Sequence, residues 1–138
     1  MNVQPYLSFE GRCQEALDFY KSAIGATIEV VMQFKDAPPD AQMQISPESK
    51  NLVMHSSFKV GDTQIMATDG GCSGASKFSG ITLTLNAKDV AEAEKLFAAL
   101  GNGGQVMMPL GETFFAHRFG MLADKFGVPW MVLAAKAM

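Results

Sequence analysis

The sequence predicts an α+β fold in which two β-α-β-β-β modules form an open mixed sheet that encloses a cleft. Two spacings carry this prediction. The alternating segment that ends at Phe9 lies 76 residues before the one that ends at Leu85. The helix-terminating glycines Gly25 and Gly101 are also 76 residues apart. A repeat of this length indicates two paired modules, because solenoids stack several shorter units.

The first module begins with a half-buried strand over residues 3–9, where apolar and polar residues alternate. Pro5 lacks an amide hydrogen, which places this strand at a sheet edge or near its own start. A helical stripe of apolar residues follows, formed by Cys13, Ala16, Leu17, Tyr20 and Ile24. Gly25 ends the predicted helix, because glycine adopts the left-handed conformation without penalty. Residues 27–34 are rich in β-formers and predict the second strand.

A long polar connection over residues 35–51 contains three prolines. Long loops in compact domains are often lids or binding elements, and a plain connection is an equal alternative. Strands follow at about 52–60 and 63–68, joined by a hairpin-type turn at Gly61-Asp62. Residues of about 70–79 predict a linker, since the helix and lysine of a phosphate-binding loop are missing.

The second module repeats the plan, beginning with alternating residues up to Leu85. Asp89 and Glu92 have the spacing of a capping box, which predicts the start of a helix that ends at the glycines of 101–104. Three further strands are predicted near 105–108, 114–119 and 128–134. The whole chain is therefore predicted to be a single domain, with module one at about 1–69 and module two at about 80–138.

Composition limits the classes of function. The 138 residues are 48% hydrophobic and 18% charged, which is typical of an ordered globular protein. A net charge of -3 argues against nucleic acid or an anionic membrane as a partner. No apolar run could span a bilayer and no signal peptide is evident, so we expect a cytoplasmic protein. Cys13 and Cys72 lack metal or redox spacing and are predicted to be reduced thiols.

Six sequence features occur in order along nearly the whole chain. They are Pro5-Tyr6-Leu7-Ser8-Phe9-Glu10-Gly11, Glu15-Ala16-Leu17-Asp18-Phe19-Tyr20, His55, Ile65-Met66-Ala67-Thr68-Asp69, Arg118-Phe119-Gly120 and Asp124-Lys125-Phe126-Gly127-Val128-Pro129-Trp130. In this order they resemble the PhnB-like group of the vicinal oxygen chelate superfamily, which includes glyoxalase I, bleomycin-resistance proteins and extradiol dioxygenases. The resemblance implies the same paired-module fold.

The resemblance also implies where a metal would bind. Metal-dependent members place four ligands, usually His, Glu or Gln, on the inner faces of the first and fourth strands of each module. Matching the modules puts these positions at Gln4 (or, in the other register, Pro5), Met66, Gly80 and Met131. Divalent metals require several His or carboxylate ligands. We therefore expect no cofactor, disfavour a divalent metal, and interpret Met66 and Met131 as adaptable pocket walls.

Strand alternation predicts further ligand contacts. Tyr6 and Ser8 share the cleft face with Gln4, and Thr82 and Thr84 face the cleft in the second module. The alternation places Trp130 on the opposite, helix-covered side from Met131.

The histidines and Arg118 are the remaining candidates. His55 is the candidate general base or substrate contact, with a hydrogen-bonded or rim histidine as the alternative. His117 is interpreted as a surface or interface residue. Arg118 could bind a carboxylate or phosphonate, or could form an ion pair with an acid such as Asp69 or Asp124. For Asp69, a role in the turn after its strand is favoured.

Three functions remain open. The first is a metal-free protein that binds a small and potentially anionic molecule in the cleft. The second is a lyase, isomerase or dioxygenase-type enzyme that uses an atypical metal set or His55 as base. The third is an accessory protein working through a partner, and superfamily members often form homodimers. A methyltransferase, a label common in the PhnB-like group, is disfavoured, because the glycines of 101–104 follow a helix and do not precede one.

Overall fold

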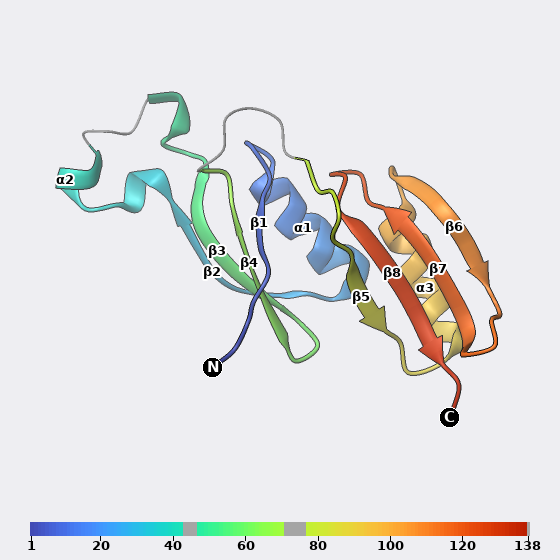
Figure 1. The fold of residues 1–138 in the computed structure, drawn as a ribbon. Coiled ribbons are helices and arrows are strands. Elements are labelled where there is room, and N and C mark those ends of the chain that lie inside the picture. Colours follow the sequence, from blue (N-terminus) through green and yellow to red (C-terminus); the bar gives the residue numbers. More distant parts are fainter. Residues whose placement is uncertain (43–46, 71–76, 138) are drawn as a thin grey trace. The chain divides into compact units, whose positions relative to one another are not determined.

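A computed structural model describes residues 1–42, 47–70 and 77–137 (Figure 1). The chain divides into two compact units, Met1–Ser76 and Lys77–Met138. Each unit holds one four-stranded mixed sheet and one long helix, which confirms the predicted pair of β-α-β-β-β modules. The predicted linker lies mostly in 71–76, which, with Cys72, falls outside the described residues. No helix in the described ranges is long and apolar enough to cross a membrane.

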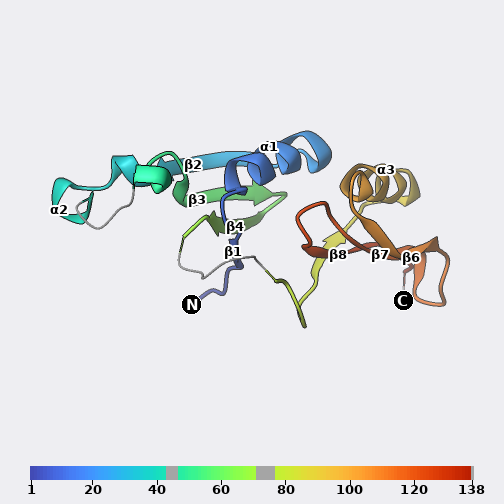
Figure 2. The same ribbon diagram turned by 90° about the horizontal axis from the view of Figure 1, so that it is seen from above.

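In the first unit the sheet has the order β1-β4-β3-β2, with β1 parallel to β4 and the other neighbours antiparallel. Helix α1 covers one face of this sheet (Figure 2). The elements are β1 (Tyr6–Ser8), α1 (Cys13–Ile24), β2 (Thr27–Gln33), β3 (Val53–Val60) and β4 (Thr63–Thr68). The first strand is shorter than predicted, in keeping with the proline at its start.

The core of the first unit lies between α1 and the sheet. Leu7 and Phe9 are buried on this side, as their alternation predicts. Tyr20 is fully buried, and its ring stacks on Phe58 with the centroids 5.7 Å apart. Gly25 follows α1 with φ of 68°, so it ends the helix in the left-handed conformation as predicted.

The side chain of Asp69 joins three segments of the first unit. Its carboxylate accepts hydrogen bonds from the backbone N–H groups of Gly11 (2.7 Å), Cys13 (2.8 Å) and Val53 (3.0 Å). The negative charge therefore lies at the N-terminus of α1, where it is stabilised by the helix dipole. Asp69 has this structural role and not that of an ion-pair partner for Arg118.

The predicted long loop between β2 and β3 contains three short helical turns: η1 (Phe34–Asp36), α2 (Pro39–Gln42) and η2 (Pro47–Ser49). Residues 43–46 of this loop lie outside the described residues. The loop begins with a capping interaction, in which the backbone N–H of Gln33 donates to Asp36 Oδ2 at 2.9 Å. The loop is thus locally structured where it leaves the sheet.

The second unit has the sheet order β5-β8-β7-β6, again with only the first pair parallel. Helix α3 covers one face of it (Figure 2). The elements are β5 (Leu83–Asn86), α3 (Val90–Gly101), β6 (Gln105–Gly111), β7 (Ala116–Ala123) and β8 (Pro129–Ala135). Strand β5 starts later than predicted, after Gly80 with its φ of 75°. Strand β7 also starts later, because the Thr113 hydroxyl accepts hydrogen bonds from the next turn.

Helix α3 begins at the predicted cap. The Asp89 side chain accepts a hydrogen bond from the backbone N–H of Glu92 at 2.8 Å. The Glu92 carboxylate accepts in return from the backbone N–H of Lys88 at 3.0 Å, one residue before the position that a capping box requires. The start of the helix is therefore confirmed, with a variant of the predicted cap.

The 76-residue repeat needs a correction. Strands β2 and β6 both have seven residues and begin at Thr27 and Gln105, which are 78 positions apart. Gly101 is the last residue of α3, and Asn102 takes the position after the helix that Gly25 has in the first unit. The match between Gly25 and Gly101 gave the wrong repeat length, because glycine occurs both inside the last turn of a helix and after it.

Candidate functional site

The face of the first sheet that α1 leaves open carries one row of side chains across all four strands. Tyr6 pairs with Met66, Met66 with Ser57, and Ser57 with Val30. Paired residues point to the same side of a sheet, so these four share a face. The next positions, Leu7, Ala67 and Ser56, are buried on the side of α1. The open face therefore combines a phenol, a hydroxyl, a thioether and an aliphatic side chain.

His55 lies beside this row. Its ring contacts Tyr6, with the ring centroids 6.0 Å apart and the planes inclined by 53°. It pairs with Met32 on the edge strand β2. The structure thus brings two predicted site residues, His55 and Tyr6, into contact on one side of the first sheet.

A cavity of about 340 Å³ opens at the end of this face. It is lined by Tyr6, Phe34, Met54, Thr68 and Gly70. Ser8, another predicted contact, donates its hydroxyl to the carbonyl of Gly70 at 3.4 Å. Phe34 and Met54 were not predicted. Both residues reach the cavity because the chain after β2 turns back over the end of the sheet. There the Phe34 N–H donates to the carbonyl of Leu52 at 3.1 Å.

Gln4 lies just before β1 and does not pair with Met66. Its side-chain amide donates to Gln64 Oε1, and Gln64 Nε2 donates to Glu29 Oε1 at 2.8 Å. Gln64 and Glu29 were missed in the sequence. Period-two alternation could have found Gln64, since it lies two residues before Met66 and so shares its face.

The open face of the second sheet carries the corresponding row. Thr84 pairs with Met131, Met131 with Met121, and Met121 with Met108. The Thr84 hydroxyl lies 3.9 Å from the sulfur of Met131. The structure therefore brings Thr84 and Met131 together as predicted, and adds two methionines from β7 and β6. Thr82 lies before β5 and outside this row.

The first- and fourth-strand positions do not fit a divalent metal. The ladder pairs Tyr6 with Met66 and Thr84 with Met131, whereas Gln4 and Gly80 precede their strands. A phenol, a hydroxyl and two thioethers form a poor donor set for a metal that prefers imidazole and carboxylate. Within residues 1–42, 47–70 and 77–137, no three His, Cys, Asp or Glu side chains gather as a metal site.

Arg118 lies on the other side of the second sheet. It pairs with the buried Ala134, and its Nε lies 3.4 Å from Glu94 Oε1 on helix α3. Its Nη1 donates to the carbonyl of His117 at 2.7 Å. Arg118 therefore has an ion-pair partner, but the acid is Glu94 and neither Asp69 nor Asp124. His117 is exposed.

Trp130 is buried on the side of α3, as its alternation with Met131 predicts. Its Nε1 donates to Asp124 Oδ2 at 2.9 Å. The other carboxylate oxygen of Asp124 accepts from the backbone N–H groups of Phe126 and Val128. Asp124 thus organises the turn before β8 and satisfies the indole, which makes both residues structural.

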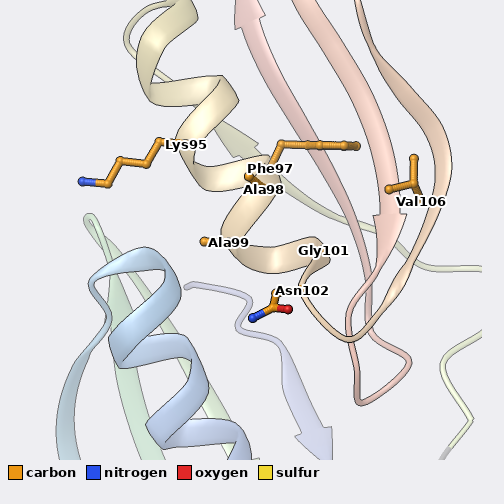
Figure 3. Close-up of a pocket in the computed structure, with 7 residues that line it drawn as sticks. All are labelled: Lys95, Phe97, Ala98, Ala99, Gly101, Asn102 and Val106. Carbon is orange, nitrogen blue, oxygen red and sulfur yellow. The ribbon is translucent and has the colours of Figure 1, made fainter.

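A second cavity, of about 570 Å³, lies along α3 (Figure 3). Its lining comes from the end of the helix and the start of β6, and consists of Lys95, Phe97, Ala98, Ala99, Gly101, Asn102 and Val106. Figure 3 shows Lys95 extending away from the helix while Phe97 points toward the strands. Because its polar groups do not converge, this cavity lacks the arrangement of a reactive centre.

Cys13 is the buried thiol of the first unit. Burial raises the pKa of the Cys13 thiol to about 12, and the nearby Asp69 carboxylate acts in the same direction. The contact with the Ser56 hydroxyl, at 3.7 Å, opposes the shift. A thiol with so high a pKa is a poor nucleophile, so Cys13 is a core residue.

Residues 1–133 match the model of the family described as 3-demethylubiquinone-9 3-methyltransferase. The chain belongs to this family. It is 35% identical to Protein YjdN of Escherichia coli (strain K12), over 99% of this chain and 97% of that protein. With this relative, the match identifies the chain as a PhnB-like member of the vicinal oxygen chelate superfamily.

Solved structures agree with this assignment. Protein PA1353 from Pseudomonas aeruginosa is 40% identical, with a TM-score of 0.86 over 97% of both chains. The putative 3-demethylubiquinone-9 3-methyltransferase, PhnB protein, from Bacillus cereus is 26% identical, with a TM-score of 0.80 over 98% of this chain and 100% of that one. A glyoxylase/bleomycin resistance protein/dioxygenase domain from Frankia sp. EAN1pec shares the fold at 12% identity, with a TM-score of 0.66 over 99% and 98%. The predicted fold class is confirmed.

Proposed function

We propose that this chain is a cytoplasmic protein that binds a small molecule with an apolar body on the open faces of its sheets, without a divalent metal. The observation that carries the proposal is the pair of rows, one across each sheet. Thioethers stand where metal-dependent relatives place ligands, and methionine side chains adapt to ligands of varied shape.

The polar groups on the first unit support binding of a specific molecule. Small-molecule sites are mainly apolar and contain a few polar groups that fix orientation. The Tyr6 phenol and the Thr68 hydroxyl provide such groups in the lining of the cavity of about 340 Å³, and the His55 imidazole contacts Tyr6 beside it. This volume lies within the range of about 300–1,000 Å³ that is common for ligand sites.

Arg118 changes the expected charge of the ligand. Because Arg118 is paired with Glu94 on the helix-covered side, it supplies no positive charge to the open face in this arrangement. The proposal therefore favours an uncharged ligand over the anion that the sequence had suggested. Arg118 would serve an anion only if it left Glu94.

An enzyme that uses His55 as a general base is the second candidate. The contact between His55 and Tyr6 favours it, since it places an imidazole, the side chain that most often serves as a general base, on the open face beside a phenol. Methyl transfer is not part of the proposal. The glycines of 101–104 join the end of α3 to the start of β6, whereas a nucleotide-type cofactor site has glycines between a strand and a following helix.

A thermal-shift screen tests the binding proposal. Untagged protein is treated with a chelator and screened against neutral aromatic and aliphatic probes, matched anions, and divalent metal ions. A neutral probe at about 100 times its Kd should stabilise the fold by about 2.7 kcal/mol, and Met131→Gln should weaken the effect. Phe114→Gln, at an exposed position outside both rows and outside the edge strands, is the control. Stabilisation by a stoichiometric metal alone would overturn the proposal.

We also propose that the protein forms a homodimer through its sheet edges. Superfamily members often dimerise. The edge strands β2 and β6 each expose three consecutive apolar residues: Val30, Val31 and Met32, and Val106, Met107 and Met108. Exposed apolar edges tend to pair with another chain. Light scattering should give a dimer for the native protein and a monomer for Met107→Lys; a monomeric native protein would contradict this.

A further inference from the structure

We propose that Glu29, Gln64 and Gln4 form a hydrogen-bond relay that makes the first unit select ligands carrying a hydrogen-bond donor. The inference rests on the proposed binding of a small molecule at the open face. It adds the chemical class of the ligand, namely an apolar body with a hydroxyl or amino group. It also assigns a positioning role to two residues that do not themselves touch the ligand, Glu29 and Gln64.

The relay connects three elements. Glu29 lies at the irregular position of β2 between Ile28 and Val30, where the register with β3 shifts. Gln64 is in β4, and its Nε2 donates to Glu29 Oε1 at 2.8 Å. Gln4 precedes β1 and donates from Nε2 to Gln64 Oε1. The carboxylate of Glu29 on β2 therefore reaches across β3 to a glutamine on β4.

The charge of Glu29 fixes the direction of the relay. An ionised carboxylate only accepts hydrogen bonds, so Gln64 must turn its NH₂ group toward Glu29. The carbonyl of Gln64 then faces Gln4, and it too can only accept. Gln4 must therefore use its own NH₂ group for this bond, which leaves Gln4 Oε1 as the outer end of the relay. Each amide has one orientation because the end of the relay is a carboxylate.

The outer end is an acceptor available to a ligand. The structure shows no hydrogen bond to Gln4 Oε1 from any described residue, and Gln4 is half-buried. Gln4 lies two residues before Tyr6, and Gln64 two residues before Met66, so the relay lies alongside the row of Tyr6, Met66, Ser57 and Val30. A molecule that covers this row and carries a donor can satisfy Gln4 Oε1. A molecule with only an acceptor there would leave two oxygens facing each other, which is unfavourable.

A probe pair and a charge reversal test the relay. The probes are 2-naphthol, which donates a hydrogen bond, and 2-methoxynaphthalene, which only accepts; both are fluorescent and uncharged. Native protein should bind 2-naphthol about five-fold more tightly, the factor for one hydrogen bond of about 1 kcal/mol. In Glu29→Lys the ammonium donates to Gln64, both amides turn over, and the preference should reverse. In Glu29→Gln, either orientation is allowed and the preference should disappear.

Controls separate selection from folding. Asp62→Lys makes the same change of charge on the exposed turn between β3 and β4, outside the relay, and should keep the preference of the native protein. Melting temperatures of all variants should stay close, because Glu29 is exposed. If Glu29 had only a structural role, its substitution would weaken the binding of both probes equally.

The outcomes also separate the inference from the proposed function. Equal binding of both probes by native protein, or an unchanged preference in Glu29→Lys, would overturn the relay while leaving small-molecule binding intact. Binding of neither probe would overturn both.

Discussion

The open sheet face of the first unit carries a phenol, a hydroxyl, an aliphatic side chain and one thioether, whereas that of the second unit carries one hydroxyl and three thioethers. Tyr6, Met66 and Ser57 in one unit correspond to Thr84, Met131 and Met121 in the other. The backbone plan is the same in both, including a parallel first pair and a helix on one face. The comparison teaches that two units with the same backbone plan can carry different chemistry on their open faces.

The two units also differ in how a buried carboxylate holds each together. Asp69 accepts hydrogen bonds from Gly11, Cys13 and Val53, which are far away in sequence, while Asp124 accepts from Phe126, Val128 and Trp130, which follow it within six residues. Removing Asp69 leaves three backbone donors without a partner, at about 1–3 kcal/mol each. Asp69→Ala should therefore lose at least about 3 kcal/mol of unfolding free energy. The loss should exceed that of Asp124→Ala, because Asp69 connects the end of β4 to the start of α1 and to β3, whereas the partners of Asp124 lie in one turn and at the start of the strand that follows it. Urea unfolding of both variants measures this; equal losses would contradict the contrast.

A smaller effect separates the units at alkaline pH, because the buried thiol of Cys13 belongs to the first unit. The pKa of Cys13 is raised to about 12 in the folded protein, mainly by burial. An unfolded thiol ionises near its ordinary pKa of 9.0, so the stabilisation is complete below that pH and is lost as the pH rises toward about 12. Stability should fall by about 1 kcal/mol between about pH 9 and 10.

Denaturant unfolding at several alkaline pH values measures this loss. Cys13→Ala should remove that part of the pH dependence, even though it lowers stability overall. If the same fall in stability with rising pH persisted in Cys13→Ala, another group would be responsible.

The smallest effect concerns the surface of the second unit. Lys136 Nζ lies 3.0 Å from Glu112 Oε2 and lowers the pKa of that carboxyl, through a hydrogen bond and through charge. Because its pKa is lowered in the folded protein, the Glu112 carboxylate stabilises the fold at pH values above the ordinary pKa of a carboxyl. This stabilisation is lost as the pH falls through the lowered pKa. Lys136→Met should raise the pKa of Glu112 in an NMR titration, without a measurable change in melting temperature, because exposed pairs contribute little. An unshifted titration would disprove the pairing.

Alternation along single strands made much of the fold predictable. It placed Leu7 and Trp130 on the helix-covered sides and Met131 on the open side, all as observed. The same alternation groups Arg118 with Gly120 and Leu122, and could have shown that Arg118 faces helix α3. The identity of its partner, Glu94, depends on how a helix packs on a distant strand, which no local pattern contains.

The relay was hidden for a related reason. Gln4, Gln64 and Glu29 meet through a parallel ladder and a bulge, and neither leaves a local signature. The match of Gly25 with Gly101 set the repeat at 76 residues, two fewer than the 78 that separate Tyr6 from Thr84, the partners of Met66 and Met131. Pairing partners far apart in sequence therefore set the limit of what the sequence alone could predict.

The buried indole of Trp130 has a practical consequence for spectroscopy. Trp130 is the single tryptophan of the chain and belongs to the second unit, whereas both tyrosines, Tyr6 and Tyr20, belong to the first. Each half of the molecule thus carries its own fluorophore. Tyrosine and tryptophan emission recorded during one denaturation experiment will report the two halves separately. Coincident transitions would mean that the halves unfold as one cooperative block, and separated transitions would give each half its own stability.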